Sequence, residues 1–182
     1  MDNHERDEAI AQKVQKGDQE AFGVLVDRYL PKMTRYAKKF LFSHDDAQDV
    51  VQEVFIKAYT NIQSFDTNRA FSSWIYRIAH NEYINALAKK KHISLITLNL
   101  DTLFPTLRSS TQPDIDLNKK EMERALNASL KHLPVKYREP LVLYYFEDLD
   151  YQHIADVLHL PVSTVGVRLS RGKALLKKYY HP

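Results

Sequence analysis

The segment 47–62 constrains the fold of this chain more than any other. Its apolar residues follow one another at steps that alternate strictly between three and one, so they form one stripe along a helix of about five turns. A second stripe, with steps of mostly three and four, runs through residues 22–40. A half-buried strand would instead alternate with a period of two. Both segments therefore predict amphipathic α-helices that bury one face.

The helical period returns in five further segments. They are predicted as helices at residues 70–91, 122–133, 134–147, 151–158 and 163–180. Ser43 and Ser163 are the predicted N-caps of the helices that follow them, because a serine hydroxyl can accept a hydrogen bond from a free N–H of the first turn. Pro134 suits the first turn of its helix, whereas Pro140 is expected to kink the same helix.

Residues 92–118 interrupt the helical pattern. They mix β-favouring residues with prolines, and the stretch SSTQPD within them is typical of a linker. A short strand at 93–100 is an alternative, although the sequence offers no partner strand. The prediction is an all-α chain with two small helical domains, at 1–91 and 119–182, joined by a flexible linker at 92–118.

The composition excludes several classes of protein. The 182 residues include no cysteine, which excludes disulfides, thiolate metal sites and cysteine nucleophiles. There is no signal-peptide pattern and no apolar run approaching the roughly 20 residues that span a bilayer. The motifs of phosphate-binding loops, dinucleotide-binding folds, serine hydrolases and zinc proteases are missing. We expect a cytoplasmic protein that is not an enzyme, without catalytic residues, metal or cofactor. An all-helical metal or nucleotide enzyme is a further interpretation, but no cluster of ligands supports it.

The C-terminal part has the spacing of a helix-turn-helix. The helices at 151–158 and from 163 are separated by four residues, and Ala155 is small where the two must pack closely. The predicted apolar seam between them consists of Ile154, Leu158, Val165 and Leu169. Arg168 and Arg171 then face outward, and residues 161–182 carry five basic and no acidic side chains. We favour DNA binding through phosphates and guanine edges; a plain helical hairpin with solvated arginines is the alternative.

A polar stripe on the helix 70–91 is a second candidate for nucleic-acid contacts. Arg77, Asn81 and Asn85 recur every four residues, and together they offer donors and acceptors that can pair with base edges. The preceding loop contains aromatic residues and a cation, which suit unstacked bases. The ring of Trp74 is expected to lie in the core, and a solvated amide is the alternative role of Asn81.

An acidic face lies on the predicted helix 45–62, opposite its apolar stripe. It consists of Asp46, Asp49, Gln52 and Glu53. Such residues often serve only solubility. These acidic residues are flanked by predicted DNA-binding elements, however, where they would repel a duplex. Binding of a basic protein partner would explain their presence.

These features occur together in the order of a known family. The segments DAQDVVQEVFIKAY (46–59), SFDTNRAFSSWIYRIAHNEYIN (64–85) and LPVKYREPLVLYYFEDLDYQHIADVLHLPVSTVGVRLSRGKALL (133–176) resemble bacterial extracytoplasmic-function sigma factors of the sigma-70 superfamily. The resemblance covers about 20–91 and 119–180. It implies a sigma2 domain, a linker and a sigma4 domain that act as a dissociable promoter-recognition subunit of RNA polymerase.

The resemblance also implies roles for individual residues. The residues matching the segment that binds core polymerase are Asp46, Asp49, Gln52 and Glu53. The residues matching the −10 DNA-binding loop and helix are Phe65, Asp66, Arg69, Phe71, Ser72, Ser73, Trp74, Arg77, Asn81 and Asn85. Those matching the −35 recognition helix, in the helix-turn-helix 151–171 and just beyond it, are Ser163, Thr164, Gly166, Val167, Arg168, Ser170, Arg171 and Lys173. The implied partners are core RNA polymerase, through the clamp helices and flap of its β′ and β subunits, promoter DNA and an anti-sigma factor, with no membrane insertion.

The chain departs from the family pattern at two positions. Gly166 and Val167 stand where many relatives carry Lys or Arg and Ser facing the DNA, so the −35 preference of this chain is expected to differ. A glycine inside a helix also costs about 0.8–1 kcal/mol relative to alanine. The competing interpretation is a stand-alone helix-turn-helix regulator that binds duplex operators as a dimer. Such a regulator has no use for the acidic face or for the polar stripe.

Overall fold

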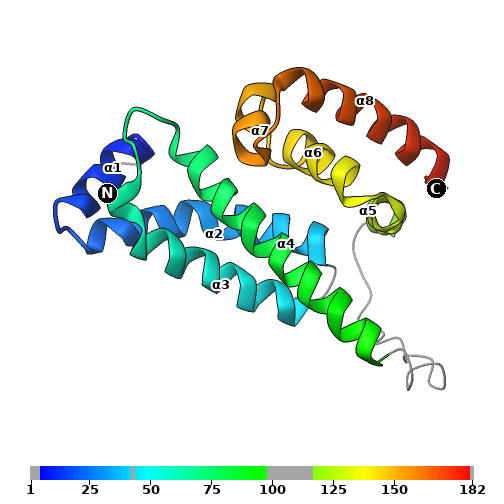
Figure 1. The fold of residues 1–182 in the computed structure, drawn as a ribbon, viewed down its shortest axis with the longest axis horizontal. Helices are drawn as coiled ribbons and strands as arrows, with labels where there is room; N and C mark the ends of the chain where they lie inside the picture. The colour runs from blue at the N-terminus through cyan, green and yellow to red at the C-terminus, as the bar shows by residue number, and fades with distance from the viewer. Residues whose placement is uncertain (1–4, 42–43, 98–116, 181–182) are drawn as a thin grey trace.

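The computed structural model describes residues 5–41, 44–97 and 117–180, and over these residues it is built from α-helices and one short 3-10 helix, without a strand (Figure 1). The all-α class predicted from the sequence is confirmed. The elements in chain order are α1 (Asp7–Gln15), α2 (Glu20–Leu41), α3 (His44–Thr60), η1 (Ile62–Ser64), α4 (Phe71–Thr97), α5 (Leu117–His132), α6 (Val135–Tyr145), α7 (Tyr151–Leu158) and α8 (Val162–Tyr179).

Helices α1 to α4 form the first bundle, and the predicted apolar stripes are its core. Helix α2 buries the residues of its stripe at Leu25, Tyr29, Met33, Tyr36, Ala37 and Phe40. Helix α3 does the same with Ala47, Val51, Val54 and Ala58. Helix α1, which the sequence analysis did not single out, closes one end of the bundle, and Tyr29 Oη donates a hydrogen bond of 2.7 Å to Asp7 of this helix. A buried tyrosine needs such a partner for its hydroxyl.

The limits of two predicted helices are corrected. Helix α4 continues to Thr97 instead of ending at residue 91, so a strand at 93–100 is wrong for residues 93–97. The β-branched residues there are compatible with a helix, because their helix propensity is only a few tenths of a kcal/mol less favourable than that of other residues and extending an existing helix is easier than starting a new one. Helix α5 begins at Leu117, inside the predicted linker 92–118. Residues 98–116 and the predicted cap Ser43 lie outside the described residues.

Helix α8 also begins differently from the prediction. Its N-cap is Pro161, in an extended conformation, and Ser163 lies in the first turn. The carbonyl of Pro161 accepts from the N–H groups of Thr164 and Val165 at 2.9 and 3.2 Å. The N-cap is therefore two residues earlier than predicted, and Ser163 lies inside the helix. Pro140 lies inside α6 and is buried; the expected kink there stays a prediction.

Helices α5 to α8 form a second bundle, and it packs against the first. Helix α7 lies beside α4, and α6 lies against α2 (Figure 1). The buried apolar residues form a continuous cluster through both bundles. The residues predicted as two domains are therefore in direct contact, and their junction runs along α4, the helix that carries the predicted polar stripe.

Candidate nucleic-acid interface

The C-terminal bundle contains the predicted helix-turn-helix, formed by α7 and α8. The carboxylate of Asp150 caps α7 by accepting a hydrogen bond of 2.8 Å from the backbone N–H of His153, and this bond lowers the pKa of Asp150. The helix ends at His159, which has a left-handed φ of 51°. The next N–H, of Leu160, donates to the carbonyl of Ala155 at 3.0 Å. The turn between the helices therefore takes residues 159–161, one fewer than predicted.

Helices α7 and α8 pack together through the predicted seam. A second contact, of α8 with α6, is close at Gly172, which the sequence analysis did not single out. The seam residues are all buried, namely Ile154, Leu158, Val165 and Leu169. At Gly172, an added Cβ would lie 3.0 Å from the carbonyl oxygen of Tyr137 and 3.0 Å from Leu141 Cδ1. A side chain at this position would make the neighbouring atoms shift by a few tenths of an ångström, so glycine favours the close approach of the two helices.

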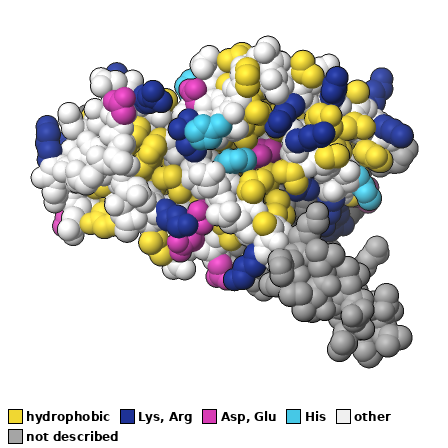
Figure 2. Space-filling view, in the orientation of Figure 1, with side chains coloured by type: hydrophobic (Ala, Val, Ile, Leu, Met, Phe, Trp, Pro, Cys, Tyr) yellow, Lys and Arg dark blue, Asp and Glu magenta, His cyan; other side chains and the backbone are white. Residues whose placement is uncertain are grey.

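The opposite face of α8 is polar and basic. Arg168 is partly exposed and Arg171 exposed, as predicted, and Figure 2 shows Lys and Arg side chains gathered over the C-terminal helices. The guanidinium of Arg171 also bonds to Tyr137 and lowers the pKa of its hydroxyl. The other predicted residues of this helix are at least partly exposed, namely Ser163, Thr164, Gly166, Val167, Ser170 and Lys173. This face can present donors to phosphates and to base edges.

Three exposed tyrosines lie together near α8, and the sequence analysis missed them. The ring of Tyr144 meets those of Tyr145 and Tyr151 edge to face, with centroids 4.9 and 5.4 Å away. Tyr151 lies beside Gly166, where an added Cβ would be 3.6 Å from Tyr151 Cε2. That is an ordinary van der Waals contact. In contrast to Gly172, the glycine at 166 is therefore not required by packing.

The predicted −10 loop before α4 is a compact turn. Asp66 accepts hydrogen bonds of 3.0 Å from both the backbone N–H and the side-chain amide of Asn68, and these bonds lower the pKa of Asp66. Its carboxylate lies 3.6 Å from Arg69 Nε, and the Arg69 side chain is 74% exposed. The first N–H of α4, at Phe71, donates to Glu8 of α1 at 3.0 Å. The loop thus presents one exposed cation, Arg69, beside the carboxylate of Asp66.

The aromatic residues predicted to contact the −10 element pack against one another, and two of them are buried. Phe65 and Phe71 are 4% and 0% exposed, and their ring centroids lie 5.4 Å apart. Both rings pack against Trp74, at 5.2 and 5.5 Å. As they stand, Phe65 and Phe71 can position the loop but cannot stack on a base. Trp74 packs on the core, as expected, and stays partly exposed.

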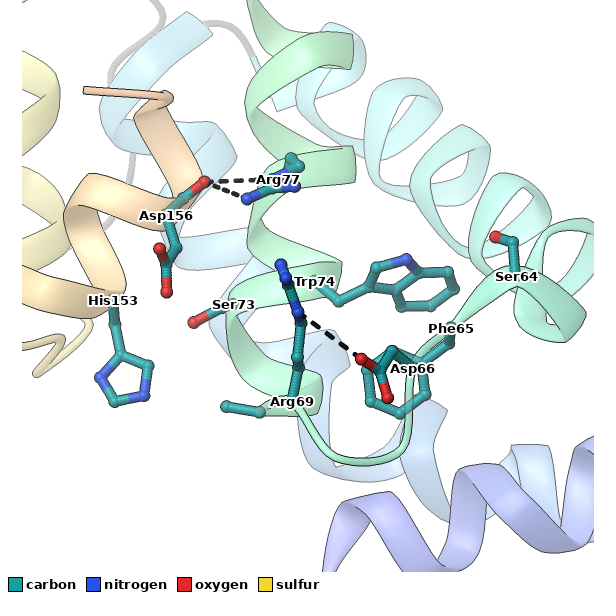
Figure 3. Close-up of a pocket in the computed structure, with 10 residues that line it drawn as sticks. Ser64, Phe65, Asp66, Arg69, Ser73, Trp74, Arg77, His153 and Asp156 are labelled. Carbon is teal, nitrogen blue, oxygen red and sulfur yellow. Dashed lines mark hydrogen bonds and ion pairs between the residues drawn. The ribbon is translucent and has the colours of Figure 1, made fainter. Parts of the chain in front are cut away.

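A cavity of about 620 Å³ lies at this place, between α4 and α7 (Figure 3). The first bundle contributes six of the predicted −10 residues to its lining, namely Phe65, Asp66, Arg69, Ser73, Trp74 and Arg77, and α7 contributes His153 and Asp156. Ser73 is 8% exposed, and its hydroxyl has no hydrogen-bond partner among the described residues. The structure therefore brings most of the predicted −10 residues together, but it places them at the junction of the two bundles.

The polar stripe of α4 is divided between this junction and the open surface. Arg77 donates from Nε and from Nη2 to the backbone carbonyl of Asp156, with the Nε contact at 3.1 Å (Figure 3). Asn81 and Asn85, one and two turns further on, are exposed, and Ser72 is partly exposed. The arginine is thus occupied by α7, whereas the two amides are free to meet a ligand.

The predicted acidic face lies on α3 of the first bundle. Asp49, Gln52 and Glu53 are exposed on α3; Asp46 is in the same helix, and its side chain is outside the described part. A groove of about 680 Å³ runs between α2 and α3, lined by apolar side chains such as Leu30, by Asp49 and Gln52, and by Lys38. Its apolar lining suits one face of an amphipathic helix, and the exposed carboxylates of Asp49 and Glu53 on α3 favour basic groups on that helix.

The described residues were also compared with the requirements of a metal site and of a membrane-spanning helix. Over the ranges given above, no group of three or more His, Cys, Asp or Glu side chains is arranged to hold a metal ion. Within the same ranges, no helix has the length and apolar character needed to cross a membrane.

Comparison with known proteins identifies the family of this chain. Residues 25–93 match the family model for sigma-70 region 2, and residues 123–176 match the model for sigma-70 region 4. The chain is 37% identical over 172 residues to the ECF RNA polymerase sigma factor SigW of Bacillus subtilis, with 91% of this chain and 92% of that protein covered. It is 34% identical over 183 residues to the ECF RNA polymerase sigma-E factor of Haemophilus influenzae, covering 97% and 96%.

The fold has a counterpart among solved structures. The structure of CnrH in complex with the cytosolic domain of CnrY superposes with a TM-score of 0.70 at 27% identity, covering 94% of this chain and 95% of that one. The likeness therefore extends over both bundles.

Proposed function

Because this chain belongs to the extracytoplasmic-function RNA polymerase sigma factors of the sigma-70 family, we propose that it joins core RNA polymerase and directs it to specific promoters. The observation that carries the proposal is the presence of both sigma-70 regions in one chain, in order, with relatives aligned over more than nine-tenths of its length. A stand-alone regulator would need only the second region. We assign no catalytic residue to the chain, since the polymerase supplies the chemistry.

Three parts of the chain have separate tasks in this proposal. Residues 1–91 act as the sigma2 domain, which binds the polymerase clamp and the −10 element. Residues 119–182 act as the sigma4 domain, which binds the −35 element, and residues 92–118 connect the two. The helical ends of this connection, in α4 and α5, belong to the neighbouring bundles.

The acidic face of α3 is the proposed contact with the clamp helices of the polymerase. Asp49 and Gln52 supply acceptors along the groove between α2 and α3, Glu53 is exposed next to Gln52, and Asp46 lies in the same helix. Glu53 is only loosely paired within the chain, 3.8 Å from Lys57 Nζ. Its carboxylate can therefore accept a partner without breaking a strong internal bond.

The polymerase flap is the proposed partner of a second groove. It lies between α5, α6 and α8, measures about 800 Å³, and is lined by apolar residues with Lys173 and Lys177 among them. Such a groove accommodates the apolar face of an amphipathic helix, and the lysines favour acidic groups beside it. The sigma factor RpoE from Bartonella quintana, which shares this fold at 22% identity, was co-crystallised in complex with the anti-sigma factor NepR, and we propose that an anti-sigma factor binds this chain as well.

Promoter DNA is contacted in two physical forms. The outer face of α8, with Arg168 and Arg171, approaches the duplex −35 element through phosphates and base edges. The loop 65–73 and the stripe on α4 contact the −10 element after its strands separate, because the Watson–Crick edges of its bases are inaccessible within the stack. Ser73 and Trp74 line the cavity that a displaced base would enter.

Run-off transcription tests the proposed function directly. Core polymerase is incubated with genomic fragments, with and without the protein, and the transcripts are mapped. We expect discrete start sites only when the protein is present. Transcripts with identical start sites in its absence would contradict the proposal, and so would specific DNA binding by the protein alone combined with no effect on the polymerase.

A further inference from the structure

Helix α1 lies beside the 3-10 helix η1 and the start of α4, the two elements that the −10 loop connects (Figure 1). The match to sigma-70 region 2 begins only at residue 25, so it assigns no role to this helix. Helix α1 is nevertheless held firmly. Its apolar residues are buried in the first bundle, and Asp7 accepts hydrogen bonds of 2.6 and 2.7 Å from Arg28 and Tyr29 of α2. The helix is therefore a fixed support beside the loop.

Gln15, the last residue of α1, holds the entry to the loop. Its side-chain nitrogen Nε2 donates to the backbone carbonyls of Ile62 and Phe65, at 2.7 and 2.8 Å. In return, Gln63 Nε2 donates to the backbone carbonyl of Gln15 at 3.0 Å. A side-chain amide has two N–H donors, and both are used here on carbonyls of one short segment. Gln15 is partly buried, so the carbonyls it contacts are sheltered from competing water.

Glu8 holds the exit from the loop. The residue before α4 is Ala70, and its methyl side chain cannot accept a hydrogen bond, as a serine or aspartate at an N-cap would. Glu8 Oε1 supplies the acceptor from another helix, because the backbone N–H of Phe71 donates to it at 3.0 Å. A carboxylate at this end of a helix also interacts favourably with the helix dipole. The start of α4 is therefore capped by α1.

The two contacts enclose the loop between them. Glu8 and Gln15 are seven positions apart in one helix, which is close to two full turns, so both lie on the same face of α1. They contact Phe65 and Phe71, the residues on either side of the loop 66–70. One face of a single rigid helix thus fixes the distance between the two ends of this loop. We call Glu8 and Gln15 the loop anchors.

The loop 66–70 depends on its ends for its position on the bundle. Asp66 accepts hydrogen bonds from Asn68 and lies beside Arg69, and these contacts stay within the turn. All three residues are exposed. The internal contacts therefore fix the shape of the turn, but not its place relative to α4. Hydrogen bonds weaken steeply outside a narrow range of distance and angle, so recognition of a base edge by this loop requires that both ends are held.

We propose that Glu8 and Gln15 are positioning residues for the recognition of the −10 element. They hold the two ends of the loop beside α4, and the loop, not α1, contacts the DNA. The identity of the ligand rests on the proposed function, whereas the anchoring of the loop does not. Loss of an anchor leaves contacts to phosphates, which carry no sequence information. Discrimination between bases is therefore the property that the anchors control.

The tryptophan fluorescence of the free protein tests the anchoring without DNA. Trp74 is the single tryptophan, and the rings of Phe65 and Phe71 pack against it, with centroids 5.2 and 5.5 Å away. We expect Gln15→Ala and Glu8→Ala to shift its emission to longer wavelength, because the rings move and water approaches. Circular dichroism checks that each variant is folded, and the two anchors give independent variants.

Two variants serve as matched controls, and both should keep the wild-type emission. Gln12→Ala removes an exposed glutamine from the same helix. Glu8→Gln retains a side-chain oxygen that can accept from the N–H of Phe71. Unchanged emission in the folded alanine variants, or an equal shift in Gln12→Ala, would overturn the anchoring.

Discrimination between −10 sequences tests the positioning role. Core polymerase carrying each variant is titrated with single-stranded oligonucleotides that have either the −10 sequence mapped by run-off transcription or altered bases at the same positions. One intramolecular hydrogen bond typically corresponds to a change of about two- to twelvefold in an equilibrium. We expect each alanine variant to lower the ratio of the two affinities by about this factor, and Glu8→Gln to restore the ratio. Binding to duplex −35 DNA should be unchanged in all variants.

The ratio separates positioning from a general loss of stability. A merely destabilised protein binds both oligonucleotides less well in the same proportion, so an unchanged ratio in both alanine variants would overturn the positioning role. Run-off transcription that yields no specific start sites would instead contradict the proposed function, and the fluorescence of Trp74 would still decide whether α1 anchors the loop.

Discussion

Alanine substitutions at the two glycines of α8, Gly166 and Gly172, are expected to change the stability of the protein in opposite directions, although both glycines lie inside the same helix. Replacing Gly166 by alanine should stabilise the protein by about 0.8–1 kcal/mol, the difference in helix propensity, because the added Cβ meets only Tyr151 at an ordinary 3.6 Å. Replacing Gly172 brings the same gain. There, however, the Cβ would lie 3.0 Å from a backbone carbonyl oxygen and from Leu141, and forcing apart a packed contact costs about 1–3 kcal/mol.

Comparison of the two alanine variants isolates packing, because the propensity gain is common to both and cancels. We expect Gly172→Ala to be less stable than Gly166→Ala by about 1–3 kcal/mol, measured by urea unfolding followed by circular dichroism. Gly172→Ala should also weaken binding to duplex −35 DNA, because α8 is displaced from α6. Equal stability of the two variants would refute the argument that Gly172 sets the position of α8.

Three further predictions concern single side chains. Asp49→Lys should weaken pull-down of core polymerase while changing the free energy of unfolding by less than about 0.5 kcal/mol, with Glu121→Lys on α5 as the charge-matched control; equal pull-down by both would contradict the clamp contact. Arg168→Ala should weaken duplex binding and reduce its salt dependence by about one unit of slope, and an unchanged slope would show that Arg168 contacts no phosphate. Asp150→Ala should cost about 1 kcal/mol at neutral pH through the lost cap of α7. Because folding lowers the pKa of Asp150, that stabilisation is present above its unfolded pKa and disappears as pH falls through the lowered value, so a difference that persists in acid would argue against the cap.

The elements of this fold could be predicted where burial follows one repeating pattern along the chain. Helix α2 buries most of the apolar stripe that its spacing indicates. Helix α3 buries Ala47, Val51, Val54 and Ala58 of its stripe but leaves Tyr59 39% exposed, and the seam of the helix-turn-helix is buried as expected. Helix ends were less predictable, because they depend on single local bonds. The first turn of α8 is bonded to the carbonyl of Pro161, so Ser163 lies inside the helix and not at its N-cap. Helix α4 continues to Thr97 through residues with strand propensity.

The contacts between the bundles could not be predicted from the chain. Glu139 and Glu147 have the side chains of surface residues, yet both are buried, because their partners come from helices far away in sequence. Arg35 and Glu147 are 112 positions apart, and no local pattern connects them. For the same reason the bond of Arg77 to α7 could not be predicted from its place in the polar stripe. The close contact at Gly172 likewise depends on the position of α6.

Permanganate footprinting of a mapped promoter tests the central claim most directly, since it detects unpaired thymines. With core polymerase and the protein together, we expect reactive thymines in the −10 region, and none with either component alone. Asn81→Ala should retain closed-complex binding but lose most of this reactivity on duplex templates, and it should discriminate less well between correct and altered −10 bases on a pre-melted template. Thymines that become reactive with core polymerase alone, or equal discrimination by wild type and Asn81→Ala on the pre-melted template, would contradict the assignment of α4 as the helix that recognises the separated strand.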